Sequence, residues 1–380
     1  MAKIIRKILT RPCARMLLIA LALLPVMLSR EITPVNEAKY LDIADEAIRD
    51  GHFWCMYHGG EVYADKPPLY FWLLMGFKAI FGRHVVPLLE LMSLVPALAV
   101  ILILDKWCSS TIKPSHLWAA ELTLATCAWF LGSSLVLRMD FLMVMFITLA
   151  LRTFWTTVRS PGGPSAPEGT KNLLLFGLWI FLAIFTKGPV GILLPLAGTL
   201  TYLFLSGQRS LIPKVWGWRT WAVIVSGCAI WLAGAALEGG STYMHNLLVH
   251  QTLGRAVNSF HHDAPPFYYL YSIWYIMAPW SPLILGTIAA ALIRKVRLSE
   301  LTRFLLAVSA SFFVMMSCFS CKLQIYLLPI LGFLTYGAFS ILSCRNRRTL
   351  INIMGIGSAT ILLAAFLVGI FWSDLLNKTF

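Results

Sequence analysis

The chain has 380 residues, of which 58% are hydrophobic and 13% are charged, and its mean hydropathy is +0.75. Soluble globular domains of ordinary composition are less apolar than this. The formal net charge of +14 would suggest a nucleic-acid partner in a soluble protein, but the basic residues lie mainly in short connections between apolar runs, where they set membrane orientation. The composition therefore predicts an integral membrane protein and excludes a soluble enzyme or a nucleic-acid-binding protein.

The first segment, residues 1–29, has basic residues before an apolar core, as a signal peptide does. It lacks a clear small-residue cleavage site. We therefore expect a retained first membrane helix.

Apolar runs long enough to cross about 30 Å of hydrocarbon recur along the whole chain. They lie near residues 14–29, 85–105, 116–136, 140–158, 172–186, 189–205, 220–237, 267–293, 301–318, 323–343 and 350–372, with a shorter candidate at 69–81. Six clusters of basic residues lie between or before these runs: Lys3, Arg6, Lys7, Arg11 and Arg15; Lys106 and Lys113; Arg159 and Lys171; Arg209, Lys214 and Arg219; Arg294, Lys295 and Arg297; and Arg345, Arg347 and Arg348. If 69–81 does not cross, all six clusters fall on one side, as the positive-inside rule requires. We therefore expect 69–81 to lie at the outer face, and about eleven transmembrane helices with a cytoplasmic N-terminus and a periplasmic C-terminus.

The predicted fold class is an all-α polytopic membrane protein forming a single membrane domain over residues 1–380. A first periplasmic loop, 30–84, is expected to carry juxtamembrane helices, and a second covers 238–266. The Pro-, Gly- and Ser-rich segment 159–171 indicates a flexible cytoplasmic linker. No soluble C-terminal domain is expected.

The stretch "EITPVNEAKYLDIADEAIRDGHFW" predicts a short helix beginning after Pro34, with Tyr40, Ile43, Ala44 and Ala47 on one side. Glu37 lies in its first turn. The spacing fits a helix-capping acid and a catalytic acid equally well.

The stretch "VYADKPPLYFW" places an acid and a lysine before two prolines. Pro67 and Pro68 prevent a helix from continuing backward, so Asp65 and Lys66 should be held where the aromatic segment enters the membrane interface. The alternative is that Lys66 only extends its charged end to water beside an ordinary aromatic belt.

Charged residues of both signs are predicted to share the outer face, where topology requires no cations. These residues are Glu37, Asp42, Asp45, Asp65, Lys66, Asp140, Lys187, His250, Arg255, His261, His262 and Lys322. This mixture suits sugar transfer from an anionic lipid, because cations stabilise the departing phosphate and carboxylates orient or deprotonate the acceptor. For Asp140, a helix-dipole partner or an ion pair is the equal alternative.

A divalent metal ion is left open. Asp65 with His250, His261 or His262 would supply suitable ligands, but their spacing matches no recognised metal signature. The CxxC at Cys318 and Cys321 is interpreted as structural. No other cofactor is predicted.

Six motifs occur in order: "NEAKYLDIADEAIRDGHFW", "YADKPPLYFWL", "RMDFLMVMFITLAL", "FTKGPVGILLPL", "FYYLYSIWYIMAPWSP" and "SCKLQIYLLP". From residue 31 to about 335, the chain resembles the bacterial aminoarabinose (lipid A) transferases and the wider dolichyl-phosphate-mannose protein mannosyltransferase-like group. The resemblance implies the GT-C glycosyltransferase fold, a polyprenyl-phosphate sugar donor and inverting transfer at the periplasmic face.

The resemblance also implies residue roles. Glu37, Lys66 and Asp140 would be catalytic; Lys187, Arg255, Lys322 and Tyr326 would bind substrate phosphate; and Asn36, Tyr40 and Asp65 would position acceptor or donor. The family usually has Asp where this chain has Asn36, and an amide cannot take a proton as a carboxylate does. That departure favours an acceptor that is already an anion, such as a lipid A phosphate.

These observations predict a bacterial inner-membrane glycosyltransferase that moves a sugar from undecaprenyl phosphate to lipid A or a related periplasmic acceptor. Its partners would be the lipid-linked donor, that acceptor and membrane lipids, without nucleic acid. The alternatives are a protein O-mannosyltransferase-like enzyme, a transporter or flippase for a polyprenyl-linked substrate, and an inactive partner subunit.

Overall fold

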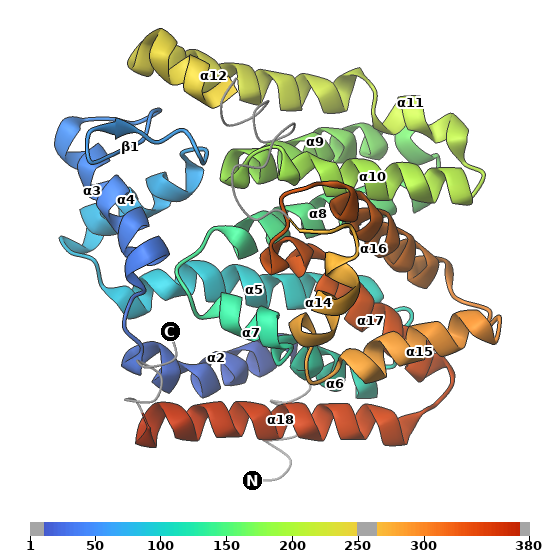
Figure 1. The fold of residues 1–380 in the computed structure, drawn as a ribbon. Coiled ribbons are helices and arrows are strands. Elements are labelled where there is room, and N and C mark those ends of the chain that lie inside the picture. Colours follow the sequence, from blue (N-terminus) through green and yellow to red (C-terminus); the bar gives the residue numbers. More distant parts are fainter. Residues whose placement is uncertain (1–10, 249–263, 373–380) are drawn as a thin grey trace.

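The computed structural model describes residues 11–248 and 264–372 as a bundle of helices that run roughly along one axis (Figure 1). Eight helices of this part of the chain are long and apolar enough to cross a membrane. They are α2 (Pro12–Ser29), α5 (Val86–Cys108), α8 (Asp140–Arg159), α9 (Pro167–Lys187), α12 (Trp218–His245), α16 (Glu300–Cys318), α17 (Leu328–Cys344) and α18 (Arg348–Phe371). Three shorter apolar helices are α4 (Leu69–Phe81), α10 (Val190–Leu205) and α15 (Ser281–Ile293). The all-α polytopic fold is confirmed; the count of about eleven crossings stays a prediction.

Two predicted continuous crossings are each broken in the middle. Residues 116–136 form α6 (Pro114–Ala125) and α7 (Ala128–Ser134), and residues 267–293 form α14 (Tyr268–Ile276) and α15. The breaks meet: the Ala128 amide donates to the Ala278 carbonyl at 2.9 Å, and the Trp280 indole N–H donates to the Thr126 hydroxyl at 2.9 Å. Irregular backbone is tolerated at membrane depth where the protein satisfies its polar groups, as it does here.

The basic connections lie together at one end of the bundle. In Figure 1 they are the loops at the right that join α5 to α6, α8 to α9, α10 to α12, α15 to α16, and α17 to α18. Two of them contact each other through the Lys113 amide and the Ser343 hydroxyl at 2.9 Å. The basic clusters described here therefore share one side, as predicted.

The segment expected to be a flexible linker, 159–171, contains a 3-10 turn, η2 (Gly163–Ser165), and the first turn of α9. The connection is therefore shorter than expected, because Pro167 fits the first turn of a helix, where its missing N–H costs nothing; its flexibility stays a prediction. The remaining short elements are η3 (Arg209–Leu211), α11 (Ile212–Val215) and η5 (Gln324–Leu327).

A layer of short elements covers the opposite end of the bundle. It comprises a π-helical turn η1 (Pro34–Ala38), α3 (Lys39–Asp50), a hairpin of β1 (Tyr57–His58) and β2 (Glu61–Val62), and α4. The predicted inner face of α3 is confirmed, since Tyr40, Ile43, Ala44 and Ala47 are all buried.

Helix α4 lies within this layer, as expected for residues 69–81. It begins directly after Pro67 and Pro68, and the indole N–H of Trp72 in its first turn donates to the Phe53 carbonyl at 2.6 Å. Near its other end, Lys78 lies 2.7 Å from Asp45 of α3, which also contacts His84 at 2.6 Å. Because both ends of α4 are tied to the same layer, it does not carry the chain across the bundle.

Helix α12 extends beyond its predicted end. The second loop was expected to begin at 238, yet the helix continues to His245 with a kink at Gly240, whose φ of 62° lies in the region that favours glycine. Just before the kink, the Glu238 carboxylate accepts bonds of 2.9–3.1 Å from the backbone amides of Phe53, Trp54 and Cys55. The anchored helix therefore extends over the juxtamembrane layer.

A second group of charges lies inside the bundle toward the basic end, contrary to the expectation that charges gather at one face. The Arg15 guanidinium donates to both oxygens of Glu121 and lies 3.7 Å from Asp105, which accepts from the Tyr336 hydroxyl at 2.6 Å. Ionisable groups are buried at membrane depth only when they find such partners. This cluster joins α2, α5, α6 and α17.

Candidate active site

Asp140 begins α8 at the layered end of the bundle and is only 2% exposed. One carboxylate oxygen accepts from the Nε–H of Arg138 at 3.0 Å, and the other accepts from the ammonium of Lys187. The N-terminus of α8 adds a favourable dipole. Asp140 is thus an ionised anchor that holds two cations side by side, which matches the ion-pair alternative for this residue.

Lys187 is the last residue of α9, and its side chain is 8% exposed. Gly188 follows with φ 87°, a conformation that ends the helix and is strained for other residues. The Lys187 ammonium lies 5.4 Å from the centre of the Tyr326 ring in η5, within range of a cation–π interaction. The structure therefore brings together Asp140, Lys187 and Tyr326, three predicted site residues that are far apart in sequence.

Tyr40 of α3 faces the same cluster. Burial raises the pKa of Tyr40 to about 12; the charges of Asp140 and Asp65 act in the same direction, against that of Arg138. All three charges are close enough to influence the Tyr40 hydroxyl. Asp65 and its neighbour Lys66 are both half-buried, and the charge of Asp65 acts on the same Tyr40 hydroxyl as the charges of Asp140 and Arg138.

Glu37 lies in a separate, fully bonded network. Its carboxylate accepts from the Arg30 guanidinium at 2.6 and 2.7 Å, from the amide and hydroxyl of Thr33 at 2.7 and 2.9 Å, and from the Leu137 amide at 2.5 Å. The side chain is 1% exposed. These contacts join the end of α2, the start of the juxtamembrane layer and the loop that carries Arg138, so in this structure Glu37 positions the site.

The same network predicts how stability depends on pH. Burial raises the pKa of Glu37, but the bonds from Arg30, Leu137 and Thr33 outweigh it and hold the pKa below its ordinary value. A lowered pKa contributes stability that is fully present above the unfolded value of about 4.3 and is lost as pH falls through the folded value.

We therefore expect the thermal midpoint of the detergent-solubilised protein to fall as the pH is lowered below about 4.3, and to fall less in the Glu37→Gln variant. The matched control is Glu61→Gln, which changes an exposed acid in the same layer. Equal pH dependence in Glu37→Gln and the unaltered protein would contradict the role of the Glu37 carboxylate.

Lys322 is buried, and its ammonium donates to the carbonyls of Ala264, at 3.0 Å, and Phe319. Lys322 thus fastens the chain at 264 to the end of α16, and its phosphate-binding role stays a prediction. Arg255 and the metal candidates His250, His261 and His262 lie outside the described residues. Within the described ranges, no group of three or more His, Cys, Asp or Glu is placed to hold a metal ion.

Three residues of these networks were not proposed as site residues from the sequence. Arg138 was considered only beside Asp140, for which an ion pair was one alternative. Arg30 and Glu90, whose side chains are 2.6 Å apart and fully buried, complete the Glu37 network.

Asn36, which was predicted to position the acceptor or donor, is exposed.

A helical bundle with a layer of short elements at one end (Figure 1) is the architecture that the resemblance implied. The resemblance to the aminoarabinose transferases and protein mannosyltransferases is confirmed by three comparisons. Residues 65–233 match the family described as dolichyl-phosphate-mannose-protein mannosyltransferase. Over 320 residues the chain is 24% identical to the undecaprenyl phosphate-alpha-4-amino-4-deoxy-L-arabinose arabinosyl transferase of Shewanella sediminis, covering 83% of this chain and 56% of that protein.

Solved structures share the fold. The ArnT crystal structure from Cupriavidus metallidurans bound to undecaprenyl phosphate superposes with a TM-score of 0.75 at 19% identity, over 93% of this chain and 64% of that one. The oligosaccharyltransferase AglB from Archaeoglobus fulgidus, in complex with an inhibitory peptide and a dolichol-phosphate, gives 0.55 at 15% identity, over 95% and 55%. The chain spans little more than half the length of the curated relatives it matches.

Proposed function

We propose that this chain is a bacterial inner-membrane glycosyltransferase that moves a sugar from undecaprenyl phosphate to lipid A or a related periplasmic acceptor, with inversion at the sugar carbon. The observation that carries the proposal is the pair of cations, Lys187 and Arg138, held together by Asp140 beside Tyr326. Two fixed cations at a membrane face suit a lipid-linked phosphate.

In the proposed reaction, an acceptor oxygen attacks the anomeric carbon of the sugar and forms the new glycosidic bond. The bond from that carbon to the phosphate oxygen breaks, and its electron pair stays on the departing undecaprenyl phosphate. Lys66, Lys187 and Arg138 stabilise this growing negative charge, and cations fixed in advance stabilise it most because they need no reorganisation during the reaction.

The bonding of the carboxylates supports a phosphate acceptor. Both oxygens of Asp140 accept from cations, and the Glu37 carboxylate accepts five hydrogen bonds. Neither acid is well placed to take a proton from a hydroxyl group. A phosphate needs positioning more than a base, so we assign Asp65 and Tyr40 to positioning the acceptor and the sugar.

The Shewanella relative is named for a donor that carries an amino sugar, 4-amino-4-deoxy-L-arabinose. A protonated sugar amine would be attracted to a carboxylate such as Asp65. We therefore propose an amino sugar as the transferred group.

The proposal is tested by mass spectrometry of lipid A from cells that express or lack the gene. Lys66→Ala should abolish the added sugar mass while the protein still accumulates in the membrane, because one phosphate cation is lost from the transition state. Arg83→Ala is the matched control, since Arg83 is exposed on the same layer. Normal lipid A modification by Lys66→Ala would refute the role of Lys66.

The family match over residues 65–233 supports one alternative, transfer to a protein hydroxyl group. The same cells distinguish the two functions. If lipid A is unmodified and periplasmic proteins carry a sugar only in cells that have the gene, the enzyme transfers the sugar to proteins and our proposal is wrong.

The buried cluster of Arg15, Asp105 and Glu121 supports the transporter alternative, because transporters place charges at membrane depth. A transport assay in proteoliposomes that showed movement of the lipid-linked sugar without a glycosidic product would favour that function.

A further inference from the structure

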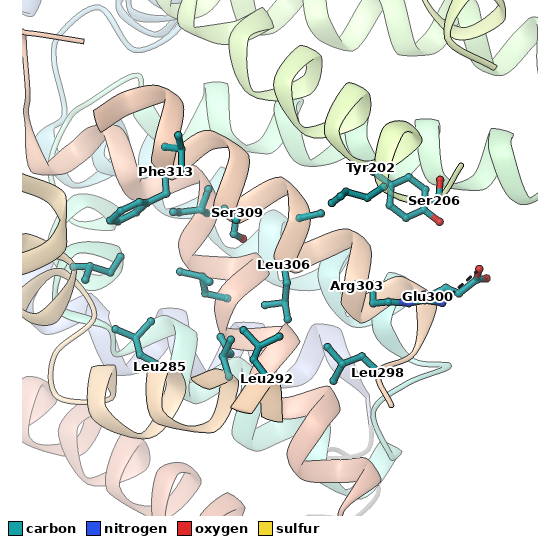
Figure 2. A pocket seen from close by; sticks show the side chains of 18 of the residues that line it. Tyr202, Ser206, Leu285, Leu292, Leu298, Glu300, Arg303, Leu306, Ser309 and Phe313 are labelled. Carbon is teal, nitrogen blue, oxygen red and sulfur yellow. Dashed lines mark ion pairs between the residues drawn. The ribbon is translucent and has the colours of Figure 1, made fainter. Parts of the chain in front are cut away.

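A recess of the protein lies among α10, α15, α16 and α17, and its lining also includes Ile273 of α14. It has a volume of about 740 Å³, which is within the range of roughly 300–1,000 Å³ typical of small-ligand sites. Figure 2 shows leucines of α15 and α16 facing each other across it. Its walls are mostly aliphatic, so its interior suits hydrocarbon.

The recess extends away from the candidate active site. Its lining includes Ser206 and Gln208 just after α10, and Glu300 and Arg303 in the first turn of α16. These positions belong to the basic end of the bundle, opposite the layer that holds Asp140 and Lys187 (Figure 1). The polar mouth of the recess therefore opens at the other membrane face.

The charge at this mouth is positive. Arg303 is 61% exposed and 3.9 Å from Glu300, but Glu300 also lies 2.5 Å from Arg159, so two guanidinium groups share one carboxylate. The adjoining connection between α15 and α16 adds exposed Arg294, Lys295 and Arg297 directly before Leu298, which lines the recess. Basic residues beside an apolar opening between helices attract anionic lipid headgroups.

We propose that this recess binds an anionic glycerophospholipid from the leaflet opposite the candidate active site, with an acyl chain between α15 and α16 and the phosphate near Arg303 and Arg297. The sugar donor does not fit this description, because its phosphate would lie at the other end of the bundle, near Lys187. The lipid site does not depend on the proposed glycosyltransferase activity.

The test measures lipid binding to the full-length protein by native mass spectrometry after exchange into detergent, with phosphatidylglycerol and phosphatidylcholine of the same acyl chains as probes. We expect phosphatidylglycerol to bind at least tenfold more tightly. Reversing two charges in Arg297→Glu/Arg303→Glu should remove that preference, because each basic group near an anionic lipid contributes about fivefold. Lys171→Glu is the control, since Lys171 is exposed at the start of α9, a helix that does not line the recess.

A second variant tests the hydrocarbon part of the site. Ala310 is exposed within the recess, so Ala310→Trp should fill it and weaken both phospholipids, while thermal unfolding confirms that the variant is folded. Equal binding of the two lipids to the unaltered protein, or an unchanged preference in the double variant, would overturn the proposal. A different result would be displacement of the phospholipids from the recess by undecaprenyl phosphate, equally well in the unaltered protein and in the double variant. That result would assign the recess to the tail of the sugar donor.

Discussion

Replacing Lys187 with methionine is expected to reduce sugar transfer about a hundredfold to a thousandfold, the usual effect of removing one charge-stabilising group from a transition state. The Lys187 ammonium is bonded to Asp140 and lies over the Tyr326 ring, so its position is fixed before substrate arrives. Methionine keeps most of the side-chain volume, and Asp140 retains Arg138 as its partner. The folded protein should therefore survive the change.

The measurement is transfer rate with purified protein and donor, compared with Lys171→Met at the opposite end of the same helix. Lys187→Arg should retain part of the activity, because charge remains while geometry changes. Asp140→Asn should lose activity although both cations remain, because nothing then holds them together. Full activity in Lys187→Met would show that the cluster is only structural.

Replacing Arg30 with methionine is expected to have the largest effect on stability, about 3–5 kcal/mol, which is typical of removing one partner from a buried ion pair. Arg30 bonds both Glu37 and Glu90, and all three side chains are at most 1% exposed. Without the guanidinium, two carboxylates face each other in a buried space. The juxtamembrane layer should then separate from α5.

Thermal unfolding in detergent and limited proteolysis of residues 30–84 measure this effect. Arg49→Met is the control, because Arg49 lies in the same layer with a side chain that is 69% exposed. The double variant Arg30→Met/Glu37→Gln should recover part of the loss, since it removes one of the two stranded charges. A midpoint equal to that of Arg49→Met would contradict the proposed network.

Apolar length predicted the main helices of the fold, because a helix in hydrocarbon must satisfy its own backbone groups over about 20 residues. The same signal could not reveal the breaks at 126–127 and 277–280, where two segments exchange hydrogen bonds across the bundle. The same signal predicted the end of α12 too early. Glu238 suggests a loop by its charge, and only the structure shows that its carboxylate accepts hydrogen bonds from the backbone amides of residues 53–55.

The candidate site was predicted in part. The count of charges by membrane side placed Asp140 and Lys187 at the same end of the bundle, where the structure joins them, because the positive-inside rule fixes which end of each helix they occupy. It could not distinguish a catalytic Glu37 from a structural one, since that depends on Arg30 and Leu137, the latter 100 residues away. Arg138 was not proposed as a site residue, because a cation beside an acid at a helix start usually pairs at the surface, where such pairs have little effect.

The central claim is that the Asp140 cluster and the juxtamembrane layer face the periplasm. Two native cysteines test it: Cys318 is exposed at the end of α16 on the side of the cluster, and Cys344 is exposed at the end of α17 on the basic side. In each variant, one of these two cysteines is the only cysteine left in the chain. Intact spheroplasts that contain the variant are treated with a membrane-impermeant maleimide, and the treatment is repeated after permeabilisation. We expect Cys318 to be labelled in intact spheroplasts and Cys344 only after permeabilisation; labelling in the reverse order would place the cluster in the cytoplasm and contradict the account.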